Sequence, residues 1–257
     1  MKWECVGLRE NKKKIQLNYK ENSKKAVFFD FDGTLTYKSP NIWKAIWQSL
    51  GYDTGKSSYF AQLFVDFMNK KITHQEWCDL TCSAFQEKDM NINILNKLVK
   101  DIKLIDGAPV VFEILKQNGF SLHVVSGNIV DVIEKILGEN VKYFDSINAN
   151  DFYFDNKNKL TYIKGTNYDF EGKAKFIEQY KEKTGVSAKN LYFVGNGDND
   201  EWAYLSGCHT ICINPEDAET NNKNKWHITI ENVDNLKDIL PFILNKKEIK
   251  ENNEREF

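Results

Sequence analysis

The sequence predicts an α/β fold, in which a doubly wound parallel sheet has helices on both faces and carries an inserted all-helical domain. Short apolar runs the length of buried strands alternate with helical patterns over most of the chain. Residues 37–105 break this rhythm and contain helical patterns only. The 257 residues, of which 41% are hydrophobic, are also numerous enough to bury the core of such a fold.

Five segments have the length and apolar character of buried strands: Ala26–Asp30, Phe120–Ser126, Leu191–Val194, Thr210–Ile213 and Trp226–Ile230. Between them lie four segments with helical patterns: Ala108–Gln117, Ile129–Leu137, Lys173–Lys183 and Glu201–Leu205. Glycines at 119, 138 and 185 follow three of these helices at positions typical of a C-cap. Strands that alternate with helices in this way favour a parallel sheet that is covered on both faces.

The inserted helical domain has its own start signals. Ser39 and Pro40 suit an N-cap residue followed by proline at the first helical position. Thr73 and Glu76 have the spacing of a capping box at the start of a later helix. We therefore expect several consecutive helices over residues 37–105.

Polar, lysine-rich segments flank these regions at both ends of the chain. Residues 1–24 are predicted to form an N-terminal extension and residues 245–257 a C-terminal tail. The α/β core is then expected to consist of residues 25–36 and 106–244.

Composition narrows the classes of function. Lysine and arginine total 35 against 37 acidic residues, and this net charge of −2 argues against a general binder of nucleic acids or membrane surfaces. No apolar run reaches the roughly 18 residues that a membrane span needs, and the N-terminus lacks a signal-peptide stretch. Five cysteines, an odd number, do not suggest a disulfide framework. We expect a cytoplasmic protein without nucleic-acid or membrane partners, of unknown oligomeric state.

Two carboxylates directly follow the first predicted strand, in the sequence Asp30-Phe31-Asp32-Gly33-Thr34. Ligands bind at the carboxyl ends of strands in open α/β sheets. Two carboxylates this close repel each other, and a hard divalent cation such as Mg²⁺ would offset that repulsion. A surface turn is the simpler alternative.

Two further motifs carry a hydroxyl and a cation. Ser126-Gly127-Asn128 ends the second predicted strand and leads into a helix, where a hydroxyl and free amides would make an anion site. An ordinary N-cap serine would look the same. Lys173 lies near the start of a helix, where its charge opposes the helix dipole, although a solvated lysine is the default interpretation.

The fourth motif is the loop Asn196-Gly197-Asp198-Asn199-Asp200, which follows the strand at Leu191–Val194. It suits a metal ligand or a close backbone approach, although a polar turn that caps the next helix would have the same composition. All four motifs fall at the carboxyl ends of strands or at the helices that follow, and these ends share one edge of a parallel sheet. Because their chemistry is complementary, we expect them to form one site.

The four motifs in this order resemble the haloacid-dehalogenase superfamily, in particular its phosphoserine-phosphatase-like branch with a helical cap of the C1 type. The resemblance implies that Asp30 is the nucleophile that becomes an aspartyl-phosphate, and that Asp32 is the acid and base. It also implies that Ser126 and the amide of Gly127 hold phosphoryl oxygens, while Lys173 neutralises charge. A Mg²⁺-dependent phosphatase of a small phosphorylated metabolite is the expected function.

The same resemblance implies the metal and substrate contacts. Mg²⁺ would be held by Asp30, Asp32 through its carbonyl, Asn196 and Asp200. The family's usual loop has Asp at the position of Asn196, so weaker metal binding is expected here. The residues expected to contact the substrate are Gly33, Thr34, Gly127, Asn128 and Asn199.

The predicted cap departs from the pattern of phosphoserine phosphatases. Ser39 stands where the family has Glu, and the chain's two arginines lie outside the cap. L-Phosphoserine is therefore not favoured, although Lys44 or Lys56 could supply a point charge. Four aromatic residues could line a pocket but are better interpreted as cap core, namely Tyr37, Trp43, Trp47 and Tyr52.

Three other functions stay open at this point. A phosphotransferase would use the same aspartyl-phosphate with a different acceptor. A binding module would retain the site but lose activity because of Asn196. A receiver domain also uses an aspartate, a hydroxyl and a lysine, but the inserted domain and the D-x-D spacing argue against it.

Overall fold

The chain folds around a seven-stranded sheet in the order β4-β3-β2-β1-β5-β6-β7. The computed structural model of this protein describes residues 24–37, 41–216 and 225–244. Only β3 and β4 pair antiparallel, and every other neighbouring pair is parallel. The strands are β1 (Lys25–Phe29), β2 (Phe120–Ile129), β3 (Ser146–Phe154), β4 (Leu160–Lys164), β5 (Leu191–Gly195), β6 (His209–Ile213) and β7 (Ile228–Ile230).

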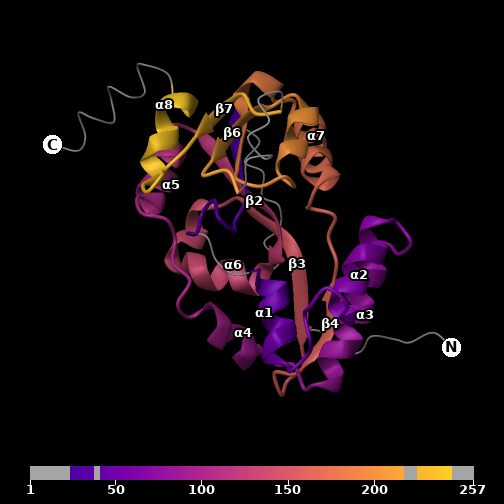
Figure 1. The fold of residues 1–257 in the computed structure, drawn as a ribbon. Helices are drawn as coiled ribbons and strands as arrows, with labels where there is room; N and C mark the ends of the chain where they lie inside the picture. Colours follow the sequence, from indigo (N-terminus) through magenta and orange to yellow (C-terminus); the bar gives the residue numbers. More distant parts are fainter. Residues whose placement is uncertain (1–23, 38–40, 217–224, 245–257) are drawn as a thin grey trace.

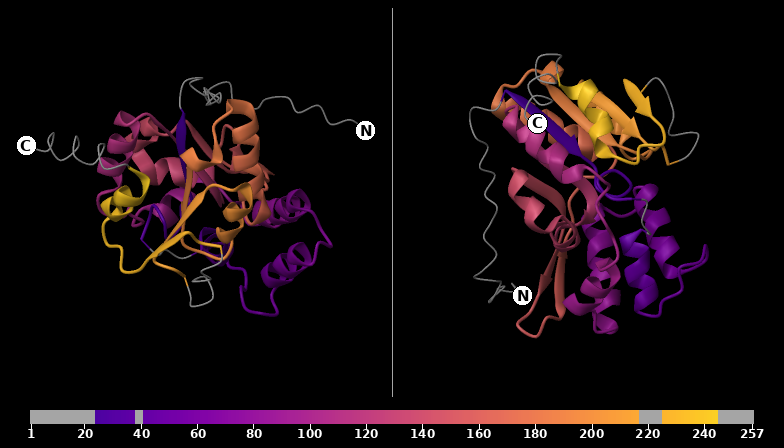
Figure 2. Two further views of the ribbon diagram at one scale, coloured as in Figure 1. Left: turned by 90° about the horizontal axis from the view of Figure 1, so that it is seen from above. Right: turned by 90° about the vertical axis from the view of Figure 1, so that its left-hand side faces the viewer.

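Helices cover both faces of the parallel part of this sheet, which confirms the predicted α/β class (Figures 1 and 2). Consecutive side chains of β1 show why, because neighbours on a strand point to opposite faces. Phe29 contacts Phe112 of α5, whereas Phe28 contacts Phe176 and Tyr180 of α7. The helices of the core are α5 (Ala108–Gln117), α6 (Val130–Leu137), α7 (Glu171–Thr184) and α8 (Leu240–Ile243).

Short 3₁₀ helices complete the core: η1 (Gly138–Tyr143), η2 (Ala188–Asn190), η3 (Glu201–Ser206) and η4 (Leu236–Ile239). In the described part of the chain, no helix combines the length and apolar character needed to traverse a bilayer. The predicted extension, apart from Lys24, and the predicted tail lie outside the described residues.

Four helices follow β1 in the inserted segment: α1 (Ile42–Ser49), α2 (Tyr59–Met68), α3 (His74–Glu87) and α4 (Ile92–Val99). The Thr73 hydroxyl accepts from the Glu76 amide while Glu76 binds back to the Thr73 amide, so the capping box is confirmed. The N-cap of α1 is Asn41, which accepts from the Lys44 amide. The expected cap at Ser39 is therefore wrong, and Ser39 itself lies outside the described residues.

The hydrophobic core of this segment is not made by helices alone. The β3–β4 hairpin leaves the main sheet and runs along the helices (Figure 1), and its Phe152 and Ile163 are fully buried in the same cluster as Trp47 and Phe85. Gln75 and Gln86 of α3 donate to backbone carbonyls of the hairpin. The elements described within residues 41–105 are all helices, as expected, and the hairpin that completes their core comes from outside this segment. The division of the chain at residues 37 and 105 stays a prediction.

The sequence analysis missed β3 and β4 and ended β2 too early. β2 continues to Ile129, and α6 begins only at Val130 without a side-chain cap. Ser126 is consequently a buried strand residue and not the N-cap of a helix. The segment expected to form an anion site on a helix N-terminus is instead the irregular end of a strand, where the pairing of β2 with β3 shifts register between Val125 and Ile129.

Candidate active site

The site begins where β1 ends, at the point in the sheet where the strand order changes direction. From β1 the chain continues to β2 on one side, while β5 lies on the other side. The amide of Asp30 donates to the Val194 carbonyl at 2.9 Å, which aligns the ends of β1 and β5. Such switch points are where open α/β sheets bind ligands. Asp30 is thus held at that point, with its side chain 7% exposed.

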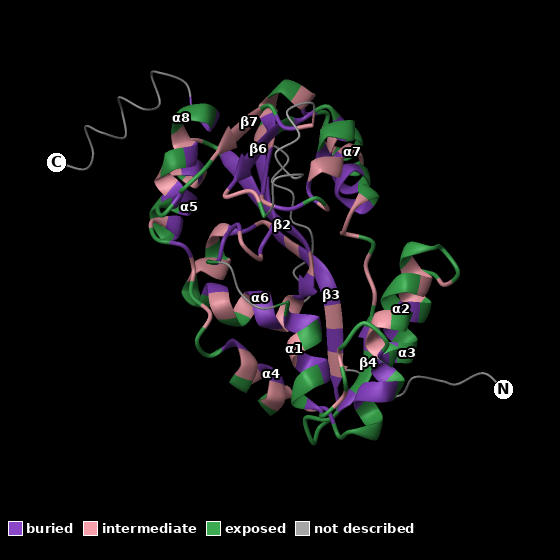
Figure 3. Cartoon of the chain, viewed as in Figure 1, coloured by how far each residue is buried: buried purple, intermediate pink, exposed green. Residues whose placement is uncertain are grey.

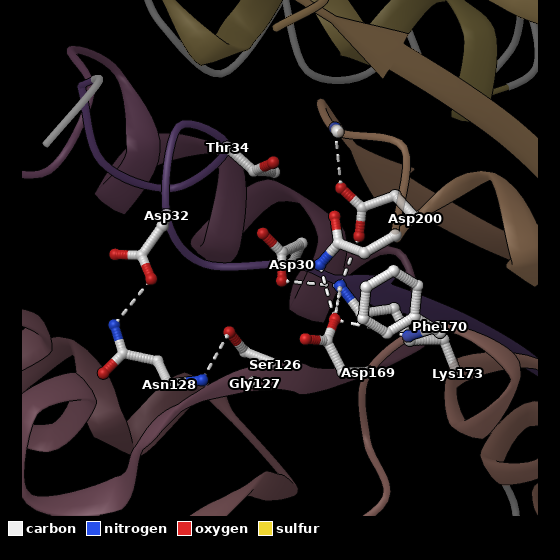
Figure 4. Close-up of polar contacts among 12 residues, drawn as sticks. Asp30, Asp32, Thr34, Ser126, Gly127, Asn128, Asp169, Phe170, Lys173 and Asp200 are labelled. Carbon is white, nitrogen blue, oxygen red and sulfur yellow. Dashed lines mark hydrogen bonds and ion pairs between the residues drawn. The ribbon is translucent and has the colours of Figure 1, made fainter. Parts of the chain in front are cut away.

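A fully buried lysine joins three carboxylates in this place (Figure 4). Lys173 Nζ lies 2.9 Å from Asp30 Oδ1 and 3.9 Å from Asp169 Oδ1, and it also forms an ion pair with Asp200. The helix that carries Lys173 starts after Phe170, whose φ of 48° is a strained value for a non-glycine residue. One ammonium facing three carboxylates leaves the cluster with excess negative charge.

The pKa values of the cluster reflect this excess. Burial and the charge of Asp200 raise the pKa of Asp30 from 3.8 to about 8, although Lys173 acts in the opposite direction. Burial disfavours the charged form of Lys173, but Asp200 and Asp30 raise its pKa above the ordinary value. Lys173 is therefore a permanent cation, and Asp30 needs further positive charge to ionise fully at neutral pH.

Asp32 and the end of β2 face each other across the mouth of the site. The side chain of Asn128 donates through Nδ2 to Asp32 Oδ2 at 2.8 Å. The backbone amide of Asn128 donates to the Ser126 hydroxyl at 3.3 Å. In Figure 4 this pair lies to one side of the cluster around Lys173. All of these residues, with Gly127 and Asp30, line one cavity. The structure therefore brings the first and second predicted motifs together.

The loop after β5 is held by Asp200. Its Oδ2 accepts the amides of Asn196 and Gly197, both at 2.9 Å. Asn196 Oδ1 accepts from the Thr34 hydroxyl at 3.1 Å, which ties this loop to the one after β1. A Cβ on Gly33, whose φ is +73°, would lie 2.5 Å from Asn196 Nδ2, so glycine permits this close approach.

Several predicted site residues lie behind the cavity wall. The lining residues include Asn196 and Asn199 but not Gly33, Thr34, Lys173 or Asp200. Thr34 is fully buried behind Asn196, so the structure assigns it to the loop and not to a surface that a ligand contacts. Asn199 donates to Asp169 Oδ1 at 2.5 Å.

The donor set suits Mg²⁺, which prefers carboxylate and carbonyl oxygens. Among the described residues, no three acidic, histidine or cysteine side chains group as a metal site by themselves. The carboxylates of Asp30 and Asp200, the amide oxygen of Asn196 and the main-chain carbonyl of Asp32 are nevertheless all hard oxygen donors. Because a single ammonium faces three carboxylates here, these residues fit a divalent cation.

The sequence analysis missed residues that hold the end of β2. Asn150 of β3 donates to the carbonyls of Gly127 at 2.7 Å and Asn128 at 3.1 Å, and Trp43 Nε1 also donates to Gly127 at 2.9 Å. His74 Nε2 lies 2.8 Å from Asn150 Oδ1. No sequence signal marks Asn150, because it belongs to a strand that was not predicted. Asp169 does have a sequence signal, namely its i,i+4 spacing to Lys173.

A cavity of about 730 Å³ opens between these residues and the inserted helices. Its far wall comes from α1, α2 and the start of α3, through residues such as Trp43, Lys44, Phe60, Phe64 and Trp77. Of the four aromatic residues considered from the sequence, Trp43 alone lines the cavity. Trp47 is packed among Tyr52 and Phe85, as core residues are, while Tyr37 is 42% exposed.

Comparisons with known proteins agree with this geometry. The probable phosphoserine phosphatase of Schizosaccharomyces pombe is 28% identical over 177 residues, which is 69% of this chain and 57% of the relative. The phosphoserine phosphatase of Archaeoglobus fulgidus is 27% identical over 180 residues, 69% of this chain and 48% of that protein. The chain thus spans about half the length of these two relatives. It spans 99% of the phosphoserine phosphatase of Methanocaldococcus jannaschii, at 26% identity over 87% of this chain.

Solved structures share the fold. A phospho-aspartyl intermediate analogue of phosphoserine phosphatase superposes with a TM-score of 0.65, at 24% identity, over 86% of this chain and all of that one. The model of the family described as haloacid dehalogenase-like hydrolase matches residues 27–201, a segment that contains all four motifs. The chain therefore belongs to the haloacid dehalogenase-like hydrolase family.

Proposed function

We propose that this chain is a Mg²⁺-dependent phosphatase that hydrolyses a phosphomonoester through a covalent phosphate on Asp30. The observation that carries the proposal is the 2.9 Å contact between Asp30 and the fully buried Lys173, 143 residues apart in the chain. A buried carboxylate beside a permanent cation, at the edge of a cavity, is arranged as a nucleophile for an anionic substrate. The names of the relatives, phosphoserine phosphatases, point to the same reaction.

Each residue has a distinct part in the proposed reaction. A carboxylate oxygen of Asp30 attacks phosphorus while the bond from phosphorus to the ester oxygen breaks. Asp32 gives its proton to the departing oxygen. It later takes a proton from the water that attacks the phosphorus of phosphorylated Asp30, and the bond from phosphorus to Asp30 then breaks and inorganic phosphate leaves. The Ser126 hydroxyl and the Gly127 amide hold phosphoryl oxygens, and Lys173 offsets their charge. Mg²⁺, held by Asp30, Asp32, Asn196 and Asp200, would supply the further positive charge that the cluster lacks.

The test is turnover of 4-nitrophenyl phosphate with Mg²⁺ by the wild type and by Asp30→Asn. We expect the substitution to lower kcat by about 10³-fold or more, because the nucleophile is lost. Asp101→Asn is the control, since that carboxylate is 85% exposed and, in the part of the chain that the structure describes, its one ion pair is with Lys100 at 3.8 Å. Acid-quenched wild type should also carry ³²P from a labelled substrate. An active Asp30→Asn variant, or a wild type that never becomes labelled during turnover, would contradict the proposal.

The same experiment separates the alternatives. A phosphotransferase would release less inorganic phosphate than alcohol when a second alcohol is added, because the phosphoryl group leaves on that acceptor. A binding module would bind phosphate esters without turnover. We favour hydrolysis because Asp32, the residue that would activate water, lines the same cavity as Asp30.

A further inference from the structure

The wall of the cavity opposite the carboxylates is apolar and incompletely covered. On α2, Phe64 is 46% and Val65 is 47% exposed, and of the helix's residues only Leu63 is buried. Figure 3 shows α2 as mostly exposed and intermediate. Phe60, Phe64 and Val65 all line the cavity. Large apolar side chains beside a pocket gain contacts when an apolar ligand group covers them.

The volume of the cavity is large for a small amino-acid phosphate. Its 730 Å³ falls within the roughly 300–1,000 Å³ typical of pockets for drug-sized ligands. The phosphoryl group occupies only the end beside Asp30 and Ser126. The remaining space extends along α1 and α2, and it suits an organic group with several more heavy atoms than serine.

Charge also separates the two walls. The acidic residues that line the cavity, Asp30, Asp32, Asp169 and Glu216, all lie outside the inserted segment. The inserted segment contributes Lys44 on α1 and Lys56 in the loop before α2, and no ion pair of either is found within the described residues. An ammonium group held against these helices would meet no carboxylate from them, and the chain has no arginine between Arg9 and Arg255 to clamp a carboxylate. The cavity therefore offers the carboxylate of an amino acid only the point charges of Lys44 and Lys56 and no bidentate clamp.

We infer that the organic part of the substrate is a bulky apolar group of aromatic size, which packs against Phe60, Phe64 and Val65 while its phosphate faces Asp30. This inference rests on the proposed function, since it names the class of ester that the same site hydrolyses. It predicts a preference that comes from binding the organic group and not from the chemistry at phosphorus.

The test compares three primary alkyl phosphates: 2-phenylethyl phosphate, ethyl phosphate and L-phosphoserine. Their leaving groups are all primary alcohols, so differences report mainly on the organic group. We expect kcat/KM for 2-phenylethyl phosphate to exceed that for ethyl phosphate by about 30-fold, because a phenyl ring buries apolar area. It should exceed that for phosphoserine as well.

Two matched variants locate the effect. Phe64→Ala should lower kcat/KM for 2-phenylethyl phosphate about fivefold more than it lowers kcat/KM for ethyl phosphate. Phe242→Ala removes a ring that is equally exposed, at 43%, but lies on α8 away from the cavity, and should change neither. Circular dichroism checks that both variants fold. Equal loss in the two variants, or none in Phe64→Ala, would overturn the inference.

A binding experiment keeps the inference separate from the proposed function. Calorimetry on the wild type with Mg²⁺ would compare 3-phenylpropylphosphonate with propylphosphonate, neither of which can be hydrolysed. Tighter binding of the aromatic compound supports the inference even if no ester is hydrolysed, an outcome that would reject the proposed function alone. Equal binding, or a kcat/KM for phosphoserine that matches the aromatic ester, overturns the inference and leaves the proposed hydrolysis intact.

Discussion

Replacing Lys173 by methionine tests whether the buried cation holds the acidic cluster together. In the wild type its Nζ pairs with Asp30 and Asp200, and its side chain is fully buried. Methionine has a similar length but no charge, so the variant would leave these carboxylates without a cation. Removing one partner from a buried ion pair costs about 3–5 kcal/mol, and we expect a loss of that size in the free energy of unfolding.

Lys175→Met is a control on the same helix. Lys175 pairs with Glu171 at 3.6 Å, but its side chain is 67% exposed, and such surface pairs contribute about 0–1 kcal/mol. Urea unfolding of the metal-free proteins, followed by circular dichroism, measures both losses. If Lys173→Met were no less stable than Lys175→Met, Lys173 would not hold the cluster and the reasoning would be refuted.

The same variant has a distinct pH dependence. The pKa of Asp30, raised to about 8, means that the metal-free wild type loses stability as the pH rises from about 4 to 8, because only the unfolded chain releases that proton. Lys173 lowers this pKa, so in Lys173→Met it would lie higher and the loss would continue above pH 8. The difference between the two proteins should thus grow from pH 7 to 9, by at most about 1.4 kcal/mol per pH unit.

Three further predictions concern single side chains. Gly33→Ala and Gly51→Ala both place a Cβ at a positive φ, and each should lower the free energy of unfolding by about 1–2 kcal/mol. Only at Gly33 would that Cβ meet Asn196, so only Gly33→Ala should also lower kcat/KM. Thermal melts and phosphatase assays of both variants decide this. Asn196→Asp adds a negative charge among the proposed metal ligands and should tighten Mg²⁺ binding by about tenfold in calorimetry, whereas no gain would contradict the charge argument. Burial lowers the pKa of His123 to about 4, so the folded protein should lose about 3 kcal/mol as the pH falls from 6.5 to 4; His123→Gln should lack this share in acid unfolding curves.

The strands and motifs around the site could be predicted because their signals are local. The segments of β1, β5 and β6 are short apolar runs, and each of the first two ends in a polar motif. Parallel pairing then places those motifs on one edge, whatever lies between them in the chain. The proximity of Asp30 and Lys173, one at a strand end and one on a helix, is a consequence of that topology.

β3 could not be predicted, because its sequence hides a strand among polar residues. Asn148 and Asn150 lie in its buried part, where they would normally argue against a strand. In the structure hydrogen bonds satisfy these two buried amide groups. Asn148 donates to the Val124 carbonyl, and Asn150 donates to the carbonyls of Gly127 and Asn128. Such partners are distant in sequence and leave no local pattern. The missed strand is therefore also the missed support of the segment that we propose to bind the phosphoryl group.

The inserted helices α2 and α3 differ in what packs against their apolar faces. The β3–β4 hairpin receives hydrogen bonds from Gln75 and Gln86, so α3 buries its apolar face against the hairpin. α2 has a more apolar sequence than α3, yet Phe64 and Val65 stay half-exposed beside the cavity. An apolar stripe at helical spacing has the same appearance in both cases. Only the tertiary partner distinguishes a helix face that packs in the core from the face that we propose to contact the substrate. The sequence therefore gives a fuller basis for the proposed chemistry at phosphorus than for the group attached to it.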